Sequence, residues 1–183
     1  MLAIKTTLHL RLSVEFLEKI IAYGKDEKII DDRTDHVNQS GSAIRLMEIG
    51  LMQIMQKWGY DGMTDEEVYD EELKLVMAAD EHGFDSTWVV EHHFEDYSFC
   101  PDNFVYLAYL AAKTKQIKLA TGAVIVPWNA QPLRIAEKAA LLDQISGGRS
   151  ILGLGRGLSR REFDQFGVDM DESRERFDEA VPM

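Results

Sequence analysis

Four apolar stretches alternate with four helical patterns along most of this 183-residue chain. The apolar stretches occupy residues 47–55, 84–90, 117–126 and 150–154, and each has the length of a buried strand. A helical pattern follows each stretch, so one strand–helix unit repeats about every 33 residues. This repeat predicts an α/β fold with a parallel sheet and right-handed crossovers.

The predicted helices have recognisable start and stop residues. A capping box over 64–67 starts the first helix, and Asp102 or Asn103 can cap the second. Pro132 opens the third helix, and a second capping box over 169–172 starts the last. Glycines end the first and third helices, at Gly83 and at Gly147 with Gly148. The last helix is expected to run toward Val181.

The unit length favours one fold class in particular. About 33 residues per unit is typical of a (β/α)8 TIM barrel of roughly 250 residues. Four strands cannot close such a barrel, so residues 44–183 are predicted to form only its first four β-α units, as a partial barrel. Either the chain is the first half of a longer enzyme or two copies meet. An open doubly wound sheet is the alternative fold.

Residues 1–43 differ from the rest and are predicted to be a leader or linker. Val14, Leu17 and Ile21 have helical spacing, which predicts one short amphipathic helix. Residues 25–42 are polar and charged, a composition typical of a linker.

Charge and cysteine content exclude several classes of partner. The net charge is −12, so a basic face for nucleic acid is not expected. No apolar run approaches the roughly 20 residues of a membrane helix, so no membrane partner is expected either. The single cysteine, Cys100, forms no intrachain disulfide and fits a reducing, cytoplasmic location.

The sequence Glu91-His92-His93-Phe94 follows directly on the second predicted strand. Active sites of α/β barrels lie at the carboxyl ends of the strands, and imidazole transfers protons near neutral pH. Because neighbouring strand residues point to opposite faces, this pair alone predicts no metal site. The alternative is that one histidine only hydrogen-bonds the rim of the barrel.

The glycine-rich segment 153–158 follows the fourth predicted strand. It is not the dinucleotide fingerprint, because the next helix is predicted only near Asp169. Backbone amides bared by glycine, together with Arg156, suit a phosphate monoester, although a tight turn explains the glycines equally well. Arg160 and Arg161 are interpreted as part of a solvated loop.

Two further features lie near the third predicted strand. Gly122 inside an apolar stretch indicates either close approach of a ligand to the backbone or simple packing against a bulky neighbour. Trp128 and Asn129 either form the wall of a pocket or are ordinary loop residues.

From about Arg45 onward, the chain resembles the N-terminal half of bacterial luciferase-like flavin-dependent monooxygenases, especially the alkanal monooxygenase α-subunit type. The resemblance is carried by the segments 91–94, 121–123, 127–132, 141–149, 155–158 and 166–174. Gly155 stands where luciferase α-subunits have a reactive cysteine, so light emission is not implied. Family members begin at the first strand and continue through four more units, so a fragment is expected.

The resemblance implies a TIM barrel that binds reduced FMN at its carboxyl face. It assigns the acid–base steps to His92, with His93 and Glu91 as further catalytic candidates. It also implies a cis peptide at Gly122-Ala123 beneath the flavin ring. The phosphate of FMN is expected to contact Arg156, Gly157 and Leu158.

The expected reaction uses reduced FMN and dioxygen to oxidise a small, aldehyde-like organic substrate. A flavin reductase is the expected partner that supplies reduced FMN, and a homodimer or heterodimer is expected. Two alternatives remain: hydride transfer with a deazaflavin cofactor on the same fold, and a half barrel without catalytic activity.

Overall fold

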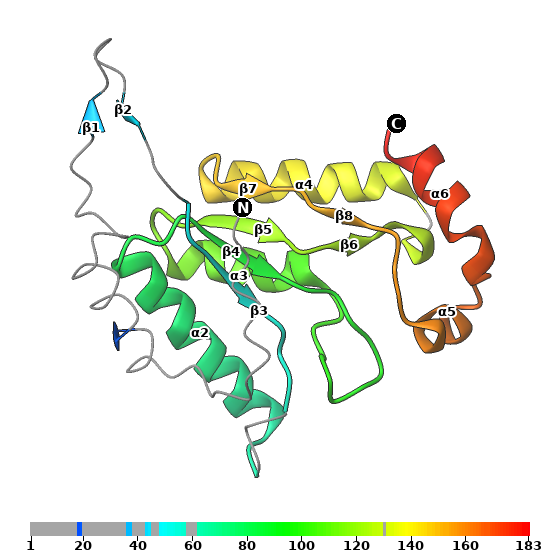
Figure 1. Ribbon diagram of the computed structural model, residues 1–183, viewed down its shortest axis with the longest axis horizontal. Helices are drawn as coiled ribbons and strands as arrows, with labels where there is room; N and C mark the ends of the chain where they lie inside the picture. Colours follow the sequence, from blue (N-terminus) through cyan, green and yellow to red (C-terminus); the bar gives the residue numbers. More distant parts are fainter. Residues whose placement is uncertain (1–17, 20–35, 38–42, 45–47, 58–61, 130) are drawn as a thin grey trace.

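The computed structural model describes residues 18–19, 36–37, 43–44, 48–57, 62–129 and 131–183 (Figure 1). The strands are β1 (His36–Val37), β2 (Ala43–Ile44), β3 (Gly50–Gln53), β4 (Ser86–Val89), β5 (Lys118–Thr121), β6 (Val124–Ile125), β7 (Ser150–Ile151) and β8 (Leu154–Gly155). The α-helices are α2 (Asp65–Glu81), α3 (Asn103–Lys113), α4 (Pro132–Ser146), α5 (Arg160–Phe166) and α6 (Ser173–Ala180). Two short 3-10 helices complete the chain, η1 (Val126–Trp128) and η2 (Met170–Glu172).

The main sheet has the strand order β3-β4-β5-β7, and all its pairs are parallel. Met52, Trp88 and Ala120 are aligned across its first three strands. The predicted parallel α/β sheet is therefore confirmed. The strands follow one another in chain order, as in a barrel wall, whereas chain order reverses at the switch point of a doubly wound sheet.

Helices cover one face of this sheet. In β3, Leu51 and Gln53 are buried whereas Gly50 and Met52 are exposed, so every second side chain points toward the helices. Helix α2 contacts β3, α3 contacts β5, and α4 contacts β7. The largest fully buried apolar side chains of this layer include Leu107, Leu110, Ile117 and Leu119. Each such side chain contributes about 1.5–3 kcal/mol through burial.

Two predicted strands are each broken in two. The stretch 117–126 forms β5 and β6, separated by a cis peptide at Gly122-Ala123. The stretch 150–154 forms β7 and the start of β8, separated at Leu152 and Gly153. At this break, the Thr121 hydroxyl donates to Gly153 O and accepts from the Gly153 N–H, each at 2.8 Å. The pairing resumes where β6 meets β8 in a parallel register.

Most of the predicted helix ends are confirmed. The 64–67 capping box is present, with both reciprocal hydrogen bonds between Thr64 and Glu67. Asp102 caps α3, because its Oδ1 accepts hydrogen bonds from the backbone amides of Phe104 and Val105, at 3.0 and 3.3 Å. Helix α4 begins at Pro132 and ends before Gly147, which has a left-handed conformation.

Two predictions near the end of the chain are wrong. Helix α5 begins at Arg160, well before the predicted start near Asp169. Ser159 and Glu162 have the spacing of a capping box, but the Ser159 side chain makes no capping hydrogen bond. The helix instead buries Glu162 and Phe163. The second capping box is absent, since Asp169 accepts a hydrogen bond from the Asp171 amide and thereby caps only η2.

The N-terminal predictions mostly lie outside the described residues, including the helix through Val14, Leu17 and Ile21. Strand β1, inside the predicted leader or linker, pairs antiparallel with β2. Within the described part of the chain, no helix has the length and apolar character needed to cross a membrane.

Candidate active site

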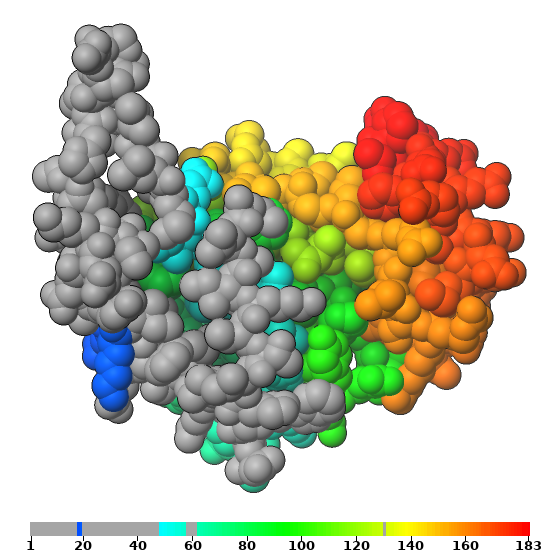
Figure 2. All heavy atoms as spheres, viewed as in Figure 1, coloured from blue at the N-terminus to red at the C-terminus, as the bar shows by residue number. Residues whose placement is uncertain are grey.

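Three loops meet at the carboxyl edge of the parallel strands. They follow β4, β6 and β8, and parallel strands place their carboxyl ends at one edge of the sheet. Figure 2 shows the loop after β4, in green, in contact with the orange surface of α5. Glu91, His92 and His93 lie on the loop after β4, and Arg156, Gly157 and Leu158 lie on the loop after β8. The other two predicted site residues, Gly122 and Ala123, lie between β5 and β6.

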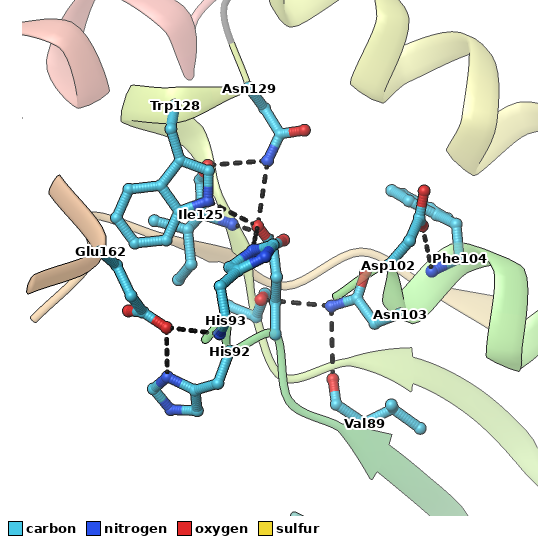
Figure 3. A network of polar contacts seen from close by, with 12 residues as sticks. Val89, His92, His93, Asp102, Asn103, Phe104, Ile125, Trp128, Asn129 and Glu162 are labelled. Atoms are coloured by element: carbon cyan, nitrogen blue, oxygen red, sulfur yellow. Dashed lines mark hydrogen bonds and ion pairs between the residues drawn. The ribbon is translucent and has the colours of Figure 1, made fainter. Parts of the chain in front are cut away.

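Glu91 connects two of the loops through its carboxylate. The side chain is only 5% exposed, and it accepts hydrogen bonds from three donors of the segment after β5. The Trp128 indole and the Asn129 amide donate to Oε1, at 2.7 and 3.2 Å. The backbone N–H of Ile125 donates to Oε2 at 3.0 Å. Trp128 and Asn129, which are labelled in Figure 3, therefore border the site and also hold Glu91 in place through these hydrogen bonds.

The two neighbouring histidines have separate carboxylate partners. His92 Nδ1 lies 3.0 Å from Glu162 Oε1, whereas His93 Nε2 lies 3.3 Å from Glu91 Oε1. The His93 backbone N–H also donates to Glu162 Oε1, at 2.7 Å. Figure 3 shows the Glu162 side chain reaching both histidines from α5.

Glu162 was not among the residues that the sequence predicted. It lies 70 positions after His92. The one local signal is the Ser159-x-x-Glu162 spacing, which is typical of a capping box and could have indicated the start of α5. Its burial, with a side chain only 4% exposed, becomes evident only when α5 is placed against the loop after β4.

An aromatic cluster surrounds His93 but leaves His92 more open. The His93 ring contacts Phe166 edge-to-face at 4.7 Å, and Phe166 stacks on Trp128 at 5.3 Å. The His93 side chain is 10% exposed and the His92 side chain is 29% exposed. On the His93 side, a cavity of about 110 Å³ is bordered by Glu91, His93, Asn103, Phe104, Trp128 and Lys138.

The predicted cis peptide between Gly122 and Ala123 is present at the end of β5. Asn103 fixes its position, because the side-chain amide donates to both Ala123 O and Val89 O, at 3.2 and 3.3 Å (Figure 3). Asn103 was predicted only as a possible helix cap. A Cβ at Gly122 would lie 3.2 Å from Cβ of Trp88, so the peptide packs closely on that side chain.

The glycine-rich segment after β8 presents an exposed guanidinium. Arg156 is exposed and makes no ion pair with any residue that the structure describes. Gly157 has φ of +87°, a conformation that favours glycine, and a Cβ there would lie 3.0 Å from the Phe163 ring. Leu158 is exposed beside it.

Arg160 and Arg161 are exposed, as interpreted from the sequence, but they lie in α5 and not in a loop. Arg161 also contacts the loop after β4. It donates to Glu95 Oε1 at 2.6 Å and to Phe94 O at 2.8 Å. Phe94 has φ of +66°, which is rare for a bulky residue, and this hydrogen bond helps to hold it there. Helix α5 therefore fastens the loop after β4 through Arg161 as well as through Glu162.

Cys100 is a poor candidate for a reactive thiol at this site. Its side chain is buried, and burial raises the pKa of the thiol to about 12. The thiol therefore stays protonated near neutral pH.

Residues 47–183 match the family described as luciferase-like monooxygenase. The alkanal monooxygenase alpha chain of Photorhabdus luminescens is 41% identical over 102 residues, which are 56% of this chain and 28% of the relative. The oxygenase component of a flavin-dependent trigonelline monooxygenase from Acinetobacter baylyi is 36% identical over 67% of this chain and 34% of the relative. The chain thus spans about a third of the length of these curated relatives.

Solved structures show the same likeness. Monooxygenase RslO1 from Streptomyces bottropensis is 41% identical with a TM-score of 0.69, over 74% of this chain and 41% of that one. The oxygenating constituent of 3,6-diketocamphane monooxygenase from Pseudomonas putida, in complex with FMN, is 27% identical with a TM-score of 0.67, over 74% and 37%. The coenzyme F420-dependent tetrahydromethanopterin reductase from Methanopyrus kandleri is 30% identical with a TM-score of 0.50, over 67% and 30%.

Proposed function

Because the chain belongs to the luciferase-like monooxygenase family, we propose that it carries part of the active site of a flavin-dependent monooxygenase. The cofactor is reduced FMN, and the substrates are dioxygen and a small, aldehyde-like organic molecule. The observation that carries the proposal is the Glu162–His92 pair, which lies at the carboxyl edge of a parallel sheet beside a cis peptide. The flavin-dependent and FMN-bound relatives support the choice of cofactor.

The chemistry of the exposed groups fits FMN. Arg156 offers an exposed guanidinium that forms no ion pair with any described residue, next to the backbone of Gly157 and Leu158. A guanidinium can donate two parallel hydrogen bonds to phosphate oxygens. The Gly122-Ala123 peptide has no bulky side chain, so its backbone can lie close to the flavin ring at the place that the resemblance implies. When bound, reduced FMN supplies the electrons with which dioxygen is reduced.

His92 carries the acid–base role in this proposal. Its Nδ1 faces Glu162, and the side chain is the more exposed of the two imidazoles, so Nε2 is the atom that exchanges a proton with the reacting groups. Glu91 and His93 are more buried and contact each other, so they orient the loop and help to exclude water.

The proposal also covers the partner proteins and the complete catalytic cycle, which involve the whole protein. A flavin reductase supplies reduced FMN, in keeping with the relative that is named an oxygenase component. The dimer expected from the sequence, the full (β/α)8 barrel and the cytoplasmic location remain part of this proposal.

A deazaflavin-dependent hydride transfer is the second candidate function. The likeness to the F420-dependent reductase favours it, because both cofactors place a phosphate and a tricyclic ring in the same kind of barrel. Titration of the chain with F420 and with FMN in parallel distinguishes the two functions, since tighter binding of F420 contradicts the monooxygenase proposal.

Binding of FMN and of riboflavin under reducing conditions tests the phosphate site. Arg156→Ala is expected to weaken FMN binding by roughly 10- to 100-fold. This is the effect of losing one hydrogen bond to a charged group, which contributes about 1.5–3 kcal/mol. Riboflavin lacks the phosphate, so its affinity should not change. The control is Arg134→Ala, which removes an exposed arginine that pairs with Glu137 on α4. Equal losses for both ligands contradict the assignment of Arg156.

His92→Ala tests the acid–base role. The variant is expected to bind FMN normally and to lower oxygen transfer by roughly 10²- to 10⁴-fold, as for a lost general acid–base. Product formation is measured with reduced FMN and a series of aldehydes. A variant that unfolds, or that keeps full activity, favours the structural alternative for His92.

A further inference from the structure

We infer that Glu162 is a positioning residue that fixes the tautomer and the orientation of the His92 imidazole. The inference rests on the proposed function, in which His92 exchanges protons. It assigns the His92 proton to Nδ1 and leaves the lone pair of Nε2 free. Glu162 itself takes no part in the proton exchange, because its carboxylate faces the opposite nitrogen of the ring.

The shared oxygen atom determines the direction of both hydrogen bonds. Glu162 Oε1 lies 2.7 Å from the His93 backbone nitrogen and 3.0 Å from His92 Nδ1. A backbone N–H can only donate, so Oε1 is an acceptor toward His93. An ionised carboxylate accepts from His92 as well, which requires the proton on Nδ1. A neutral imidazole has one N–H, so Nε2 then carries the lone pair.

The remaining contacts restrict rotation of the His92 ring without blocking it. Tyr97 packs edge-to-face against the ring, with 5.4 Å between the ring centres. The Glu162 side chain is 4% exposed and the His92 side chain is 29% exposed, so the pair is protected on the Nδ1 side and open elsewhere. A hydrogen bond screened from water in this way specifies orientation more strongly than a surface pair does.

Glu162 also helps to attach α5 to the loop after β4, so a purely structural role must be separated from a positioning role. Arg161 holds the same loop independently, through Phe94 O and Glu95. Loss of the Glu162 carboxylate therefore leaves α5 attached. The discriminating property is the tautomer of His92, which a purely structural contact would not determine.

Long-range ¹H–¹⁵N NMR spectra of the ¹⁵N-histidine-labelled 183-residue chain report the tautomer directly. The chain has five histidines, and the spectrum of His92→Gln identifies the His92 signals. In the wild type, the neutral His92 ring is expected to carry its proton on Nδ1. Glu162→Ala should produce a mixture of both tautomers. Glu162→Gln should keep the Nδ1–H form, because the His93 N–H fixes the amide oxygen at the shared position.

The control is Glu95→Gln, an exposed carboxylate of the same loop that pairs with Arg161. It should leave the His92 tautomer unchanged. The inference is overturned if wild-type His92 carries its proton on Nε2, or if folded Glu162→Ala keeps the wild-type tautomer. It is also overturned if folded Glu162→Gln changes to the Nε2–H form. The wild-type spectrum decides the question even if Glu162→Ala does not fold.

Turnover separates this inference from the proposed function. Glu162→Ala is expected to lower kcat for oxygen transfer by about 10-fold or more, up to the 10²–10⁴-fold of a lost general acid–base, with KM unchanged. Glu162→Gln should recover most of that loss. If the tautomer responds but the wild type transfers no oxygen to any substrate, the proposed function fails and the positioning role stands. If oxygen is transferred but the tautomer does not respond, the positioning role fails and the proposed function stands.

Discussion

At the scale of single residues, the site is organised by two buried carboxylates with different tasks. Glu91 accepts from a backbone amide, an indole and a side-chain amide of the β6–η1 segment, and so connects it to the loop after β4. Glu162 connects that same loop to α5 through His92 and His93. The sequence indicated Glu91, because it directly follows a strand, whereas for Glu162 it offered only the Ser159-x-x-Glu162 spacing of a helix start and no sign of the contact with His92. Contacts between distant segments have no signature in local spacing.

Glu91→Gln should destabilise the protein before it affects chemistry. The substitution replaces one acceptor oxygen by an NH₂ group in a site where three donors already bond both oxygens, so at least one buried donor loses its partner. The expected loss is about 1–3 kcal/mol in the free energy of unfolding, measured by urea denaturation. Glu137→Gln, which removes an exposed carboxylate paired with Arg134, should cost much less. Unchanged stability with lost oxygen transfer would instead make Glu91 a catalytic group.

At the scale of secondary structure, the sequence predicted best what is determined locally. Thr64, Asp102 and Pro132 mark helix starts through contacts within a few residues, and all three predictions are confirmed. The break after β5 coincides with the cis peptide that the resemblance implied at Gly122-Ala123. The break at Gly153 was not predictable, because it depends on hydrogen bonds to Thr121, 32 positions away. Helix α5 was missed for the same reason, since burial of Phe163 and Glu162 against other segments stabilises it without a cap.

Asp80 illustrates how one side chain joins two elements, and it gives a prediction at this scale. The buried carboxylate near the end of α2 accepts from the backbone amides of Lys115, Gln116 and Ile117, at 2.7–2.9 Å. It thereby fixes the start of β5. Asp80→Ala leaves these donors unpaired, and at least one is fully buried, so the loss should be at least about 1–3 kcal/mol.

Thermal and urea unfolding of the 183-residue chain measure the effect of Asp80→Ala. The matched control is Asp70→Ala, an exposed position on the same helix that should change stability by less than about 0.5 kcal/mol. Similar values for the two variants would show that the turn before β5 does not depend on Asp80.

At the scale of the whole molecule, four parallel strands and three covering helices form the frame that brings the site together. The sheet follows chain order, and its two outer strands, β3 and β7, each pair on one side only within the described part of the chain. Such edges are where further strands or a second chain add to a sheet. The frame was predictable because it repeats, whereas the site residues from α5 and η1 depend on how the repeats pack.

The stability of the whole molecule should depend on pH through Glu72. This side chain lies beneath the sheet, where Gln53 Nε2 donates to its carboxylate at 3.1 Å. Burial raises the pKa of Glu72 to about 7 from a usual value of 4.5, and the Gln53 hydrogen bond offsets only part of that effect. Between these values, the folded protein binds a proton that the unfolded chain has released. Stability should therefore fall as the pH rises from about 4.5 to about 7, and then level off.

Glu72→Gln should remove this pH dependence, because an amide carries no charge to bury. At pH 8 the variant should be more stable than the wild type by up to about 3 kcal/mol, and near pH 4.5 the two should be nearly equal. Urea midpoints measured across this range test the expectation, with Glu66→Gln as a control at an exposed position of α2. A parallel shift of the Glu72→Gln curve at every pH would mean that the amide changes packing rather than charge. In that case the folded and the unfolded protein would release the Glu72 proton over the same pH range, and Gln53 Nε2 would donate to an ionised carboxylate at neutral pH.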